Sequence, residues 1–232
     1  MKKKAIVLLS GGLDSAVTLF WARKNGFDCS CLLFDYGQRH VREIESAKKI
    51  ARKAGCGYKI IRLRFPWKGS SLTDKSIHLP KNTAVLDADI IPSTYVPARN
   101  TIFLSMALSY AEATGASAIF IGANSVDFSG YPDCRPQYYR AFRKMAALGT
   151  RCGTEGRPVS VLTPLIKKSK AQIIRLARKL GVPVELTWSC YSGGRTPCGK
   201  CDSCRIREKG FKEAVMSHGS AKAVIDNQKK QS

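Results

Sequence analysis

The stretch Lys4-Ala-Ile-Val-Leu-Leu-Ser10-Gly11-Gly12-Leu13-Asp14-Ser15 joins an apolar run to a glycine turn and then to the start of a helix. A continuous apolar run of this length is typical of a strand buried on both faces of a parallel sheet. Beyond the turn, the apolar residues keep helical spacing until Gly26. The stretch therefore predicts a strand, a tight turn and a helix, which is the opening unit of an α/β fold.

The same alternation of strand and helix continues along the chain. Apolar runs predict four more strands, over 29–35, 58–63, 118–122 and 159–163. Helical spacing predicts helices over 44–54, 101–114, 137–148 and 169–180, and Ser169 with Gln172 forms a capping box for the last of them. Residues 65–92 have no period and carry three prolines, so we expect an irregular insertion there. This order predicts a doubly wound parallel α/β sheet.

The chain divides at one place only. Residues 1–212 are expected to form a single domain, which ends in a cysteine-rich loop over 188–207. Residues 213–232 are mainly polar, and we expect them to fray as a tail.

The turn at 10–15 lies where a helix N-terminus meets the carboxyl edge of the predicted sheet. Backbone N–H groups and the helix dipole at such a position suit an anion. Gly11 and Gly12 allow close approach of a phosphate, the Ser10 and Ser15 hydroxyls can donate to it, and Asp14 fits a Mg²⁺ contact or a helix cap. No Gly-Lys-Ser/Thr follows, so this is not a Walker loop. A plain glycine turn with a capping side chain is the alternative that the turn alone leaves open.

Three further segments carry chemistry-bearing residues at the ends of predicted elements. They are Phe-Asp-Tyr-Gly-Gln-Arg-His at 34–40, Ser-Thr-Tyr-Val-Pro-Ala-Arg-Asn at 93–100, and Gly-Ala-Asn at 122–124 with the loop 127–136. Arg99 is placed to neutralise phosphate, and the aromatic, Asp and Arg residues of the last loop suit a guanine-like edge and a substrate carboxylate. Taken singly, these residues also fit core packing or a structural ion pair.

Four of the nine cysteines are crowded near the C-terminus. Cys198, Cys201 and Cys204 have metal-ligand spacing, and Cys190 lies eight residues upstream. Four thiolates can close a tetrahedral shell around Zn²⁺. An iron–sulfur cluster and a redox-active pair are the alternatives. Cys134 stands apart from this group, in the expected substrate loop, where a small buried residue is the simpler interpretation.

The turn at 10–15 resembles the SGGxDS loop of the N-type ATP pyrophosphatases, the PP-loop superfamily. The further segments resemble one family within it, the 7-cyano-7-deazaguanine synthases, through SGGLDS, FDYGQRH, STYVPARN, GAN, DFSGYPDCRP and the cysteine segment. The likeness extends from about residue 4 to residue 212. It implies that ATP activates 7-carboxy-7-deazaguanine as an adenylate, that free ammonium gives an amide, and that a second ATP leads to the nitrile precursor of queuosine.

The resemblance also implies which residues do this work. The ATP-binding residues would be Leu9, Ser10, Gly11, Gly12, Leu13, Asp14, Ser15, Ala16, Val17, Thr18 and Leu19. Asp14, Ser15 and Arg99 would be catalytic. The substrate would contact Tyr36, Gln38, Asn124, Asp127, Tyr131, Asp133 and Arg135. Cys190, Cys198, Cys201 and Cys204 would hold a structural Zn²⁺, Mg²⁺ would accompany ATP, and the protein would be a homodimer.

The charge of the chain favours anionic partners. Lys plus Arg number 39 against 17 Asp plus Glu, a formal net charge of +22, but the basic residues are dispersed. A small-molecule substrate is therefore favoured over nucleic acid. The alternatives are a tRNA-modifying PP-loop enzyme, a non-catalytic zinc module that binds nucleic acid, and a relative that stops at the amide. The run at 5–9 is too short for a secretion signal or a membrane span, so we expect a cytoplasmic protein without membrane partners.

Overall fold

A five-stranded parallel sheet forms the centre of the molecule. The computed structural model describes residues 2–80, 91–125 and 130–216. The strand order is β3-β2-β1-β4-β5, and every neighbouring pair is parallel. The strands are β1 (Lys3–Leu8), β2 (Phe27–Asp35), β3 (Tyr58–Arg62), β4 (Ala118–Phe120) and β5 (Ser160–Leu162). All five predicted strands are present, and the predicted doubly wound α/β class is confirmed.

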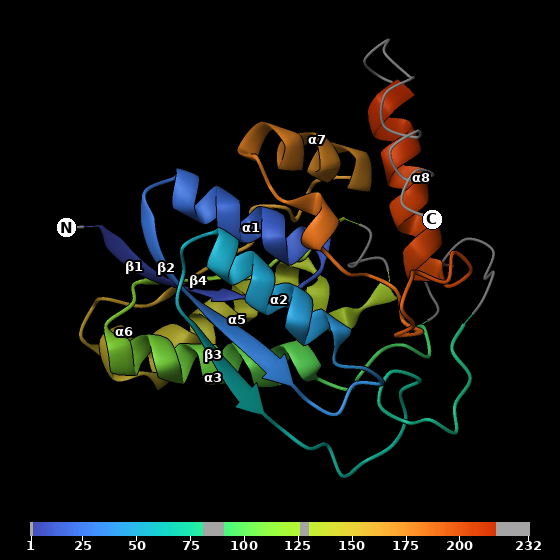
Figure 1. Cartoon of the computed structure of the whole chain (residues 1–232). Helices are drawn as coiled ribbons and strands as arrows, with labels where there is room; N and C mark the ends of the chain where they lie inside the picture. The colour runs from blue at the N-terminus through green and yellow to red at the C-terminus, as the bar shows by residue number, and fades with distance from the viewer. Residues whose placement is uncertain (1, 81–90, 126–129, 217–232) are drawn as a thin grey trace.

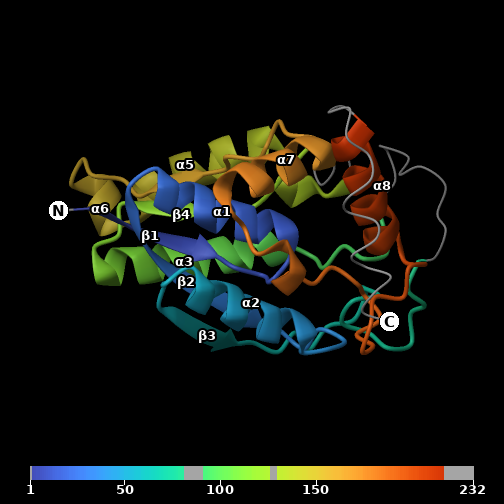
Figure 2. The ribbon, with the colours of Figure 1, turned by 45° about the horizontal axis from the view of Figure 1, so that its top comes forward.

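Helices cover both faces of the sheet (Figures 1 and 2). One face packs against α1 (Leu13–Lys24), α2 (Arg42–Lys53) and α7 (Lys170–Leu180), and the other against α3 (Arg99–Thr114) and α5 (Pro136–Gly149). The remaining elements are the short α6 (Arg151–Thr154), 3₁₀ turns at Pro132–Cys134 and Val184–Leu186, and α8 (Asp202–Met216). In Figure 1, α8 stands at the end of the sheet toward which the strands point.

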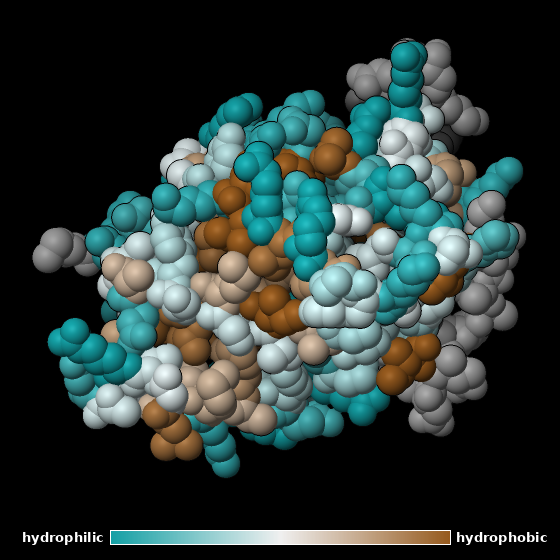
Figure 3. Space-filling model, turned by 90° about the horizontal axis from the view of Figure 1, so that it is seen from below, coloured by the Kyte–Doolittle hydropathy of each residue, from teal (hydrophilic) through white to brown (hydrophobic). Residues whose placement is uncertain are grey.

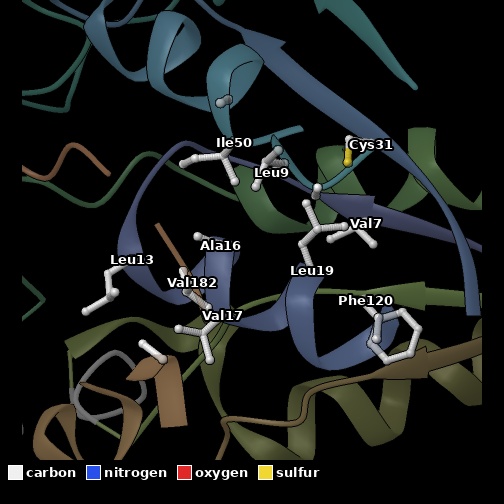
Figure 4. Close-up of a cluster of buried hydrophobic side chains, with 14 of the residues drawn as sticks. Val7, Leu9, Leu13, Ala16, Val17, Leu19, Cys31, Ile50, Phe120 and Val182 are labelled. Carbon is white, nitrogen blue, oxygen red and sulfur yellow. The ribbon is translucent and has the colours of Figure 1, made fainter. Parts of the chain in front are cut away.

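Alternate residues of β1 enter two separate cores, because successive side chains of a strand point to opposite faces. Val7 and Leu9 join Leu19 of α1 and Ile50 of α2 on one side, as Figure 4 shows. Ile6 and Leu8 pack on the other side with side chains of α3 and α5. The apolar run of the opening stretch is thus explained by burial on both faces.

Most of the predicted elements are confirmed, and the C-terminal helix is the main difference. The described part of the 65–92 insertion contains no helix or strand, as expected. The sequence did not predict α8, which begins within the cysteine segment and continues to Met216, four residues beyond 212. Ala214 is 1% exposed and belongs to the α1 side of the core, so α8 is packed onto the body at least that far.

The predicted capping box of α7 is present in full. Ser169 Oγ accepts from the Gln172 backbone N–H at 3.3 Å, and Gln172 Oε1 accepts from the Ser169 backbone N–H at 2.9 Å. Replacing Ser169 with alanine is expected to destabilise the protein by about 1 kcal/mol, because one N–H of the first turn loses its acceptor. Thermal unfolding should then shift down by roughly 2–4 °C. An unchanged melting temperature would contradict this assignment.

The surface mixes hydrophilic and apolar areas. Figure 3 shows one face, where hydrophilic residues surround a central apolar area. None of the helices within the described residues combines the length and the apolar character needed to span a bilayer.

Candidate active site

A cavity of about 320 Å³ opens at the carboxyl ends of β1, β2 and β4. Its wall is made by the phosphate loop (residues 10–15), the segment after β2, the first turns of α2, α3 and α7, and the cysteine-rich segment with α8. Ligands of open α/β sheets bind outside the carboxyl ends of the strands. The cavity therefore lies where the fold predicts a binding site.

The phosphate loop is held in shape by its two serines. Ser15 Oγ donates to the Gly12 carbonyl at 3.0 Å and accepts from the Ser10 backbone N–H at 3.2 Å. The two serine hydroxyls lie 3.0 Å apart. Helix α1 begins directly after Gly12, and no side chain of the described residues caps its start. The first N–H groups of α1 therefore remain available to an anion in the cavity.

Two glycines allow the loop to pack closely between other elements. Gly11 has φ +87°, and a Cβ there would lie 2.2 Å from the Glu43 carbonyl oxygen of α2. At Gly122, after β4, a Cβ would lie 2.9 Å from the Asp14 carbonyl carbon and the Ser15 nitrogen. The loop is thus fixed by main chain on both sides, where a side chain cannot fit.

Asp14 lies in an ion pair that the sequence did not predict. Lys170, the first residue of α7, places its Nζ 2.7 and 2.9 Å from the two carboxylate oxygens. Asn124 Nδ2 donates to the same carboxylate at 3.2 Å. Lys170 and Asp14 both line the cavity, whereas Asn124 is fully buried behind Asp14. Asn124 thus orients Asp14, and Lys170 adds a positive charge beside the phosphate loop.

The ion pair predicts a measurable effect on stability. Replacing Lys170 with glutamine is expected to destabilise the protein by about 1–2 kcal/mol, less than for a fully buried pair because both side chains keep some exposure. The melting temperature should fall by roughly 2–8 °C. Lys179→Gln in the same helix removes an exposed lysine and serves as the control. Equal melting temperatures for the two variants would show that the pair contributes nothing.

Arg99, at the first position of α3, lines the same cavity as the phosphate loop. Its Nη1 donates to the Tyr36 hydroxyl at 3.1 Å, and its guanidinium lies 5.6 Å from the centre of the Tyr36 ring. Burial raises the pKa of Tyr36, so the hydroxyl stays neutral. Gln38 holds the chain after β2, accepting from the Tyr36 backbone N–H at 2.9 Å and donating to the Phe34 carbonyl at 3.3 Å. Tyr36, Gln38 and Arg99 thus form one polar group on the cavity wall.

The loop around η1 (Pro132–Cys134) divides into lining and supporting residues. Tyr131 lines the cavity, and its hydroxyl lies 2.6 Å from Thr94 Oγ1. Asp133 is buried, and its Oδ2 accepts from the Asn100 backbone N–H at 3.0 Å, so it caps the start of α3. Burial raises the pKa of Asp133. Its position supports Arg99 from behind.

The remaining residues that were expected to bind the substrate or ATP differ in whether they line the cavity, lie buried behind it or are exposed. Arg135 is exposed at the start of α5, and Asp127 lies outside the described residues. Cys134 lines the cavity and accepts from Asn100 Nδ2 at 3.1 Å. Four of the expected ATP residues are buried in the first turns of α1 and support the loop from below, namely Ala16, Val17, Thr18 and Leu19.

The four clustered cysteines converge on one point. The sulfur atoms of Cys190, Cys198, Cys201 and Cys204 all lie within 4.8 Å of one another. A tetrahedral ion with bonds of about 2.3 Å to sulfur holds its sulfurs roughly 3.8 Å apart, which this cluster fits. Backbone N–H groups of residues 192 and 198 point at Cys190 Sγ at 3.4 and 3.3 Å. The cluster has the geometry of a metal-binding site, as the cysteine spacing predicts.

The metal-binding segment also forms one wall of the cavity. The Trp188 backbone N–H donates to the Gly11 carbonyl at 2.9 Å, and Trp188 Nε1 donates to the Cys190 carbonyl at 2.9 Å. Arg207, three residues after the last cysteine, lines the cavity and donates to Thr187 Oγ1 at 2.8 Å. The metal cluster is therefore joined to the phosphate loop through Trp188.

A parallel sheet, an SGGxDS turn at its carboxyl edge and a polar cavity above that turn define a protein of the PP-loop class. The chain belongs to the family described as Queuosine biosynthesis protein QueC, whose family model matches residues 4–215.

Curated relatives cover nearly the whole chain. A protein named 7-cyano-7-deazaguanine synthase from Trichodesmium erythraeum (strain IMS101) is 52% identical over 217 residues, 92% of this chain and 98% of that protein. Another of the same name from Thermosynechococcus vestitus is 54% identical over 214 residues, 91% of this chain and 92% of that protein. Among solved structures, NMN synthetase from Francisella tularensis is similar with a TM-score of 0.48 and 15% identity over 97% of this chain and 88% of that chain.

Proposed function

We propose that this chain converts 7-carboxy-7-deazaguanine and ammonia into 7-cyano-7-deazaguanine at the expense of ATP, a step of queuosine biosynthesis in the cytoplasm. Membership of the QueC family and relatives of that name at 52 and 54% identity support the substrate. The observation that supports the chemistry is the cavity, which is lined both by the phosphate loop and by a polar group of Tyr36, Gln38 and Arg99. One end suits phosphates and the other a polar heterocycle with a carboxylate.

The reaction activates the same carbon twice. A carboxylate oxygen of the substrate attacks the α-phosphorus of ATP, pyrophosphate leaves, and an acyl adenylate forms. Ammonia then displaces AMP to give the amide. The amide oxygen attacks the α-phosphorus of a second ATP, pyrophosphate leaves, and the nitrogen loses one proton to give an adenylated imidate. The C–O bond to AMP then breaks, AMP leaves with the electron pair, and loss of the second N–H proton gives the nitrile. The scheme needs no covalent enzyme intermediate, so positioning and charge stabilisation carry the catalysis.

The residues take roles that follow from their places. The loop over residues 9–19 holds ATP, with the N–H groups at the start of α1 and the Ser10 and Ser15 hydroxyls toward the β- and γ-phosphates. Arg99 stabilises charge on the α-phosphate, and Asp14 is the carboxylate that would hold the Mg²⁺ that accompanies ATP. For the substrate, the family resemblance supplies the set Tyr36, Gln38, Asn124, Asp127, Tyr131, Asp133 and Arg135. Of these, Tyr36, Gln38 and Tyr131 line the cavity.

We assign Zn²⁺ to the four cysteines as a structural ion. Four sulfur ligands complete a tetrahedral shell and leave no position for a substrate. The ion would fix the segment over 188–207 against the phosphate loop. The homodimer is part of the same proposal, and light scattering after size exclusion measures it directly.

The test is an incubation of the purified protein with 7-carboxy-7-deazaguanine, ammonium, Mg²⁺ and ATP, followed by mass spectrometry. Nitrile that forms only when substrate and ATP are both present supports the proposal. Reaction that stops at the amide would replace it with an amide synthetase. Absence of turnover by metal-loaded protein that binds ATP would overturn the free-base substrate.

A further inference from the structure

One carboxylate in the cavity has no hydrogen-bond or ion-pair partner among the described residues. The residues that line the cavity include two carboxylates, Asp14 and Glu43. Asp14 is paired with Lys170. Among the described residues, no hydrogen bond or ion pair engages the Glu43 carboxylate. A carboxylate in such a place is available to a cationic or proton-donating ligand.

The position of Glu43 is fixed by the phosphate loop itself. Glu43 is the second residue of α2, and its carbonyl oxygen occupies the space that a Cβ at Gly11 would need. The side chain thus enters the cavity beside the loop, in a wall that also carries Arg99 and Tyr36. Among the described residues, Arg99 of α3 is the charged group that acts on the Glu43 carboxylate, and it lowers the pKa of that carboxylate. The Glu43 carboxylate in turn raises the pKa of Tyr36, which lies in the segment after β2. Burial raises the pKa of Glu43 to about 7.

The charges of the cavity are complementary to the reactants. Arg99 and Arg207 suit the phosphates of ATP, and Lys170 lies beside the phosphate loop in its pair with Asp14. The remaining reactant of the proposed reaction is ammonium, which is a cation at neutral pH and must lose a proton before it can attack. A carboxylate that accepts a proton near neutral pH suits this step.

We infer that Glu43 binds ammonium and acts as the general base that releases ammonia onto the acyl adenylate. The inference rests on the proposed function. The Glu43 carboxylate takes one proton from ammonium, and the nitrogen lone pair forms the C–N bond. The C–O bond to AMP breaks, AMP leaves with the electron pair, and a second proton leaves the nitrogen to give the amide.

The test compares Glu43→Gln with the wild type and with Glu45→Gln, which removes an exposed carboxylate from the same helical turn. With ammonium as nucleophile, amide formation by Glu43→Gln is expected to fall roughly 100-fold, the usual contribution of a general base. Glu45→Gln should match the wild type. Hydroxylamine, which is neutral near pH 7, should give hydroxamate with Glu43→Gln at a rate within about fivefold of the wild type, because no base is needed first.

Two further readouts separate the inference from the proposed function. Substrate-dependent exchange of pyrophosphate into ATP should survive in Glu43→Gln, because adenylation precedes the ammonia step. Nitrile formation from the supplied amide should also survive. Equal losses with ammonium and hydroxylamine, or loss of pyrophosphate exchange, would overturn the inference and indicate a role in binding ATP, Mg²⁺ or the base. Failure of the wild type to form any adenylate would instead overturn the proposed function.

Discussion

Replacing Gly11 with alanine is expected to lower turnover at least about 100-fold and the melting temperature by roughly 6–12 °C. The added Cβ would lie 2.2 Å from the Glu43 carbonyl oxygen and 2.9 Å from the Ala47 nitrogen, and both atoms belong to the backbone of α2. A φ of +87° adds strain for any side chain. Together these effects cost about 3 kcal/mol, and they displace the loop that receives the phosphates. Calorimetry and steady-state kinetics measure the two losses.

Gly57→Ala is the matched control for this variant. Gly57 is exposed before β3, its φ lies outside the left-handed region, and a Cβ there would meet no atom within 4 Å. This substitution should leave stability and turnover nearly unchanged. If Gly11→Ala behaved like Gly57→Ala, the close packing of the loop against α2 would not be needed for stability or turnover.

Replacing Cys201 with serine is expected to remove the bound metal and with it most of the activity. Cys201 is 2% exposed and is one of four sulfurs that converge on one point. Loss of a ligand from a closed site weakens metal binding that also contributes folding energy. A loss of about 4 kcal/mol lowers the melting temperature by roughly 8–16 °C. Metal analysis, calorimetry and the nitrile assay on one preparation measure the three effects together.

Cys152→Ser controls for the loss of a thiol elsewhere, since Cys152 lies in α6 and is not part of the cluster.

Hydrogen exchange of Cys201→Ser adds a local readout. Protection should fall first in α8 and around Trp188, because these segments are joined to the cluster and to the Gly11 carbonyl. Full activity in a metal-free Cys201→Ser protein would show that the cysteines do not shape the cavity.

The sequence predicts the fold well where the signals are local. Apolar runs and helical spacing predict the sheet, and the capping box of Ser169 and Gln172 lies within four consecutive residues. The phosphate loop and the metal-binding cysteines are also local, because each is read from one short segment. Helix α8 was not predicted because it begins inside the cysteine segment and its sequence has no clear apolar face. Its packing against α7 is visible only in the structure.

Parts of the site depend on contacts between distant residues, which spacing cannot reveal. Lys170 and Asp14 are 156 positions apart and meet only because α7 packs beside α1. From the sequence, Asp133 is expected to contact the substrate. In the structure its carboxylate caps α3, a helix that begins 34 positions earlier. Glu43 resembles any charged residue in the first turn of a helix. Only the packing of α2 against the phosphate loop places it in the cavity.

The cavity wall that contains Trp188, Ser203 and Arg207 is synthesised after all five strands of the sheet. The five strands are complete by residue 162, so the sheet can form while this wall is still being synthesised. A nascent chain therefore carries a phosphate loop but an open cavity, and it cannot yet shield an acyl adenylate from water. If a metal ion fixes this wall, starvation for that metal is expected to lower specific activity before it lowers the amount of protein.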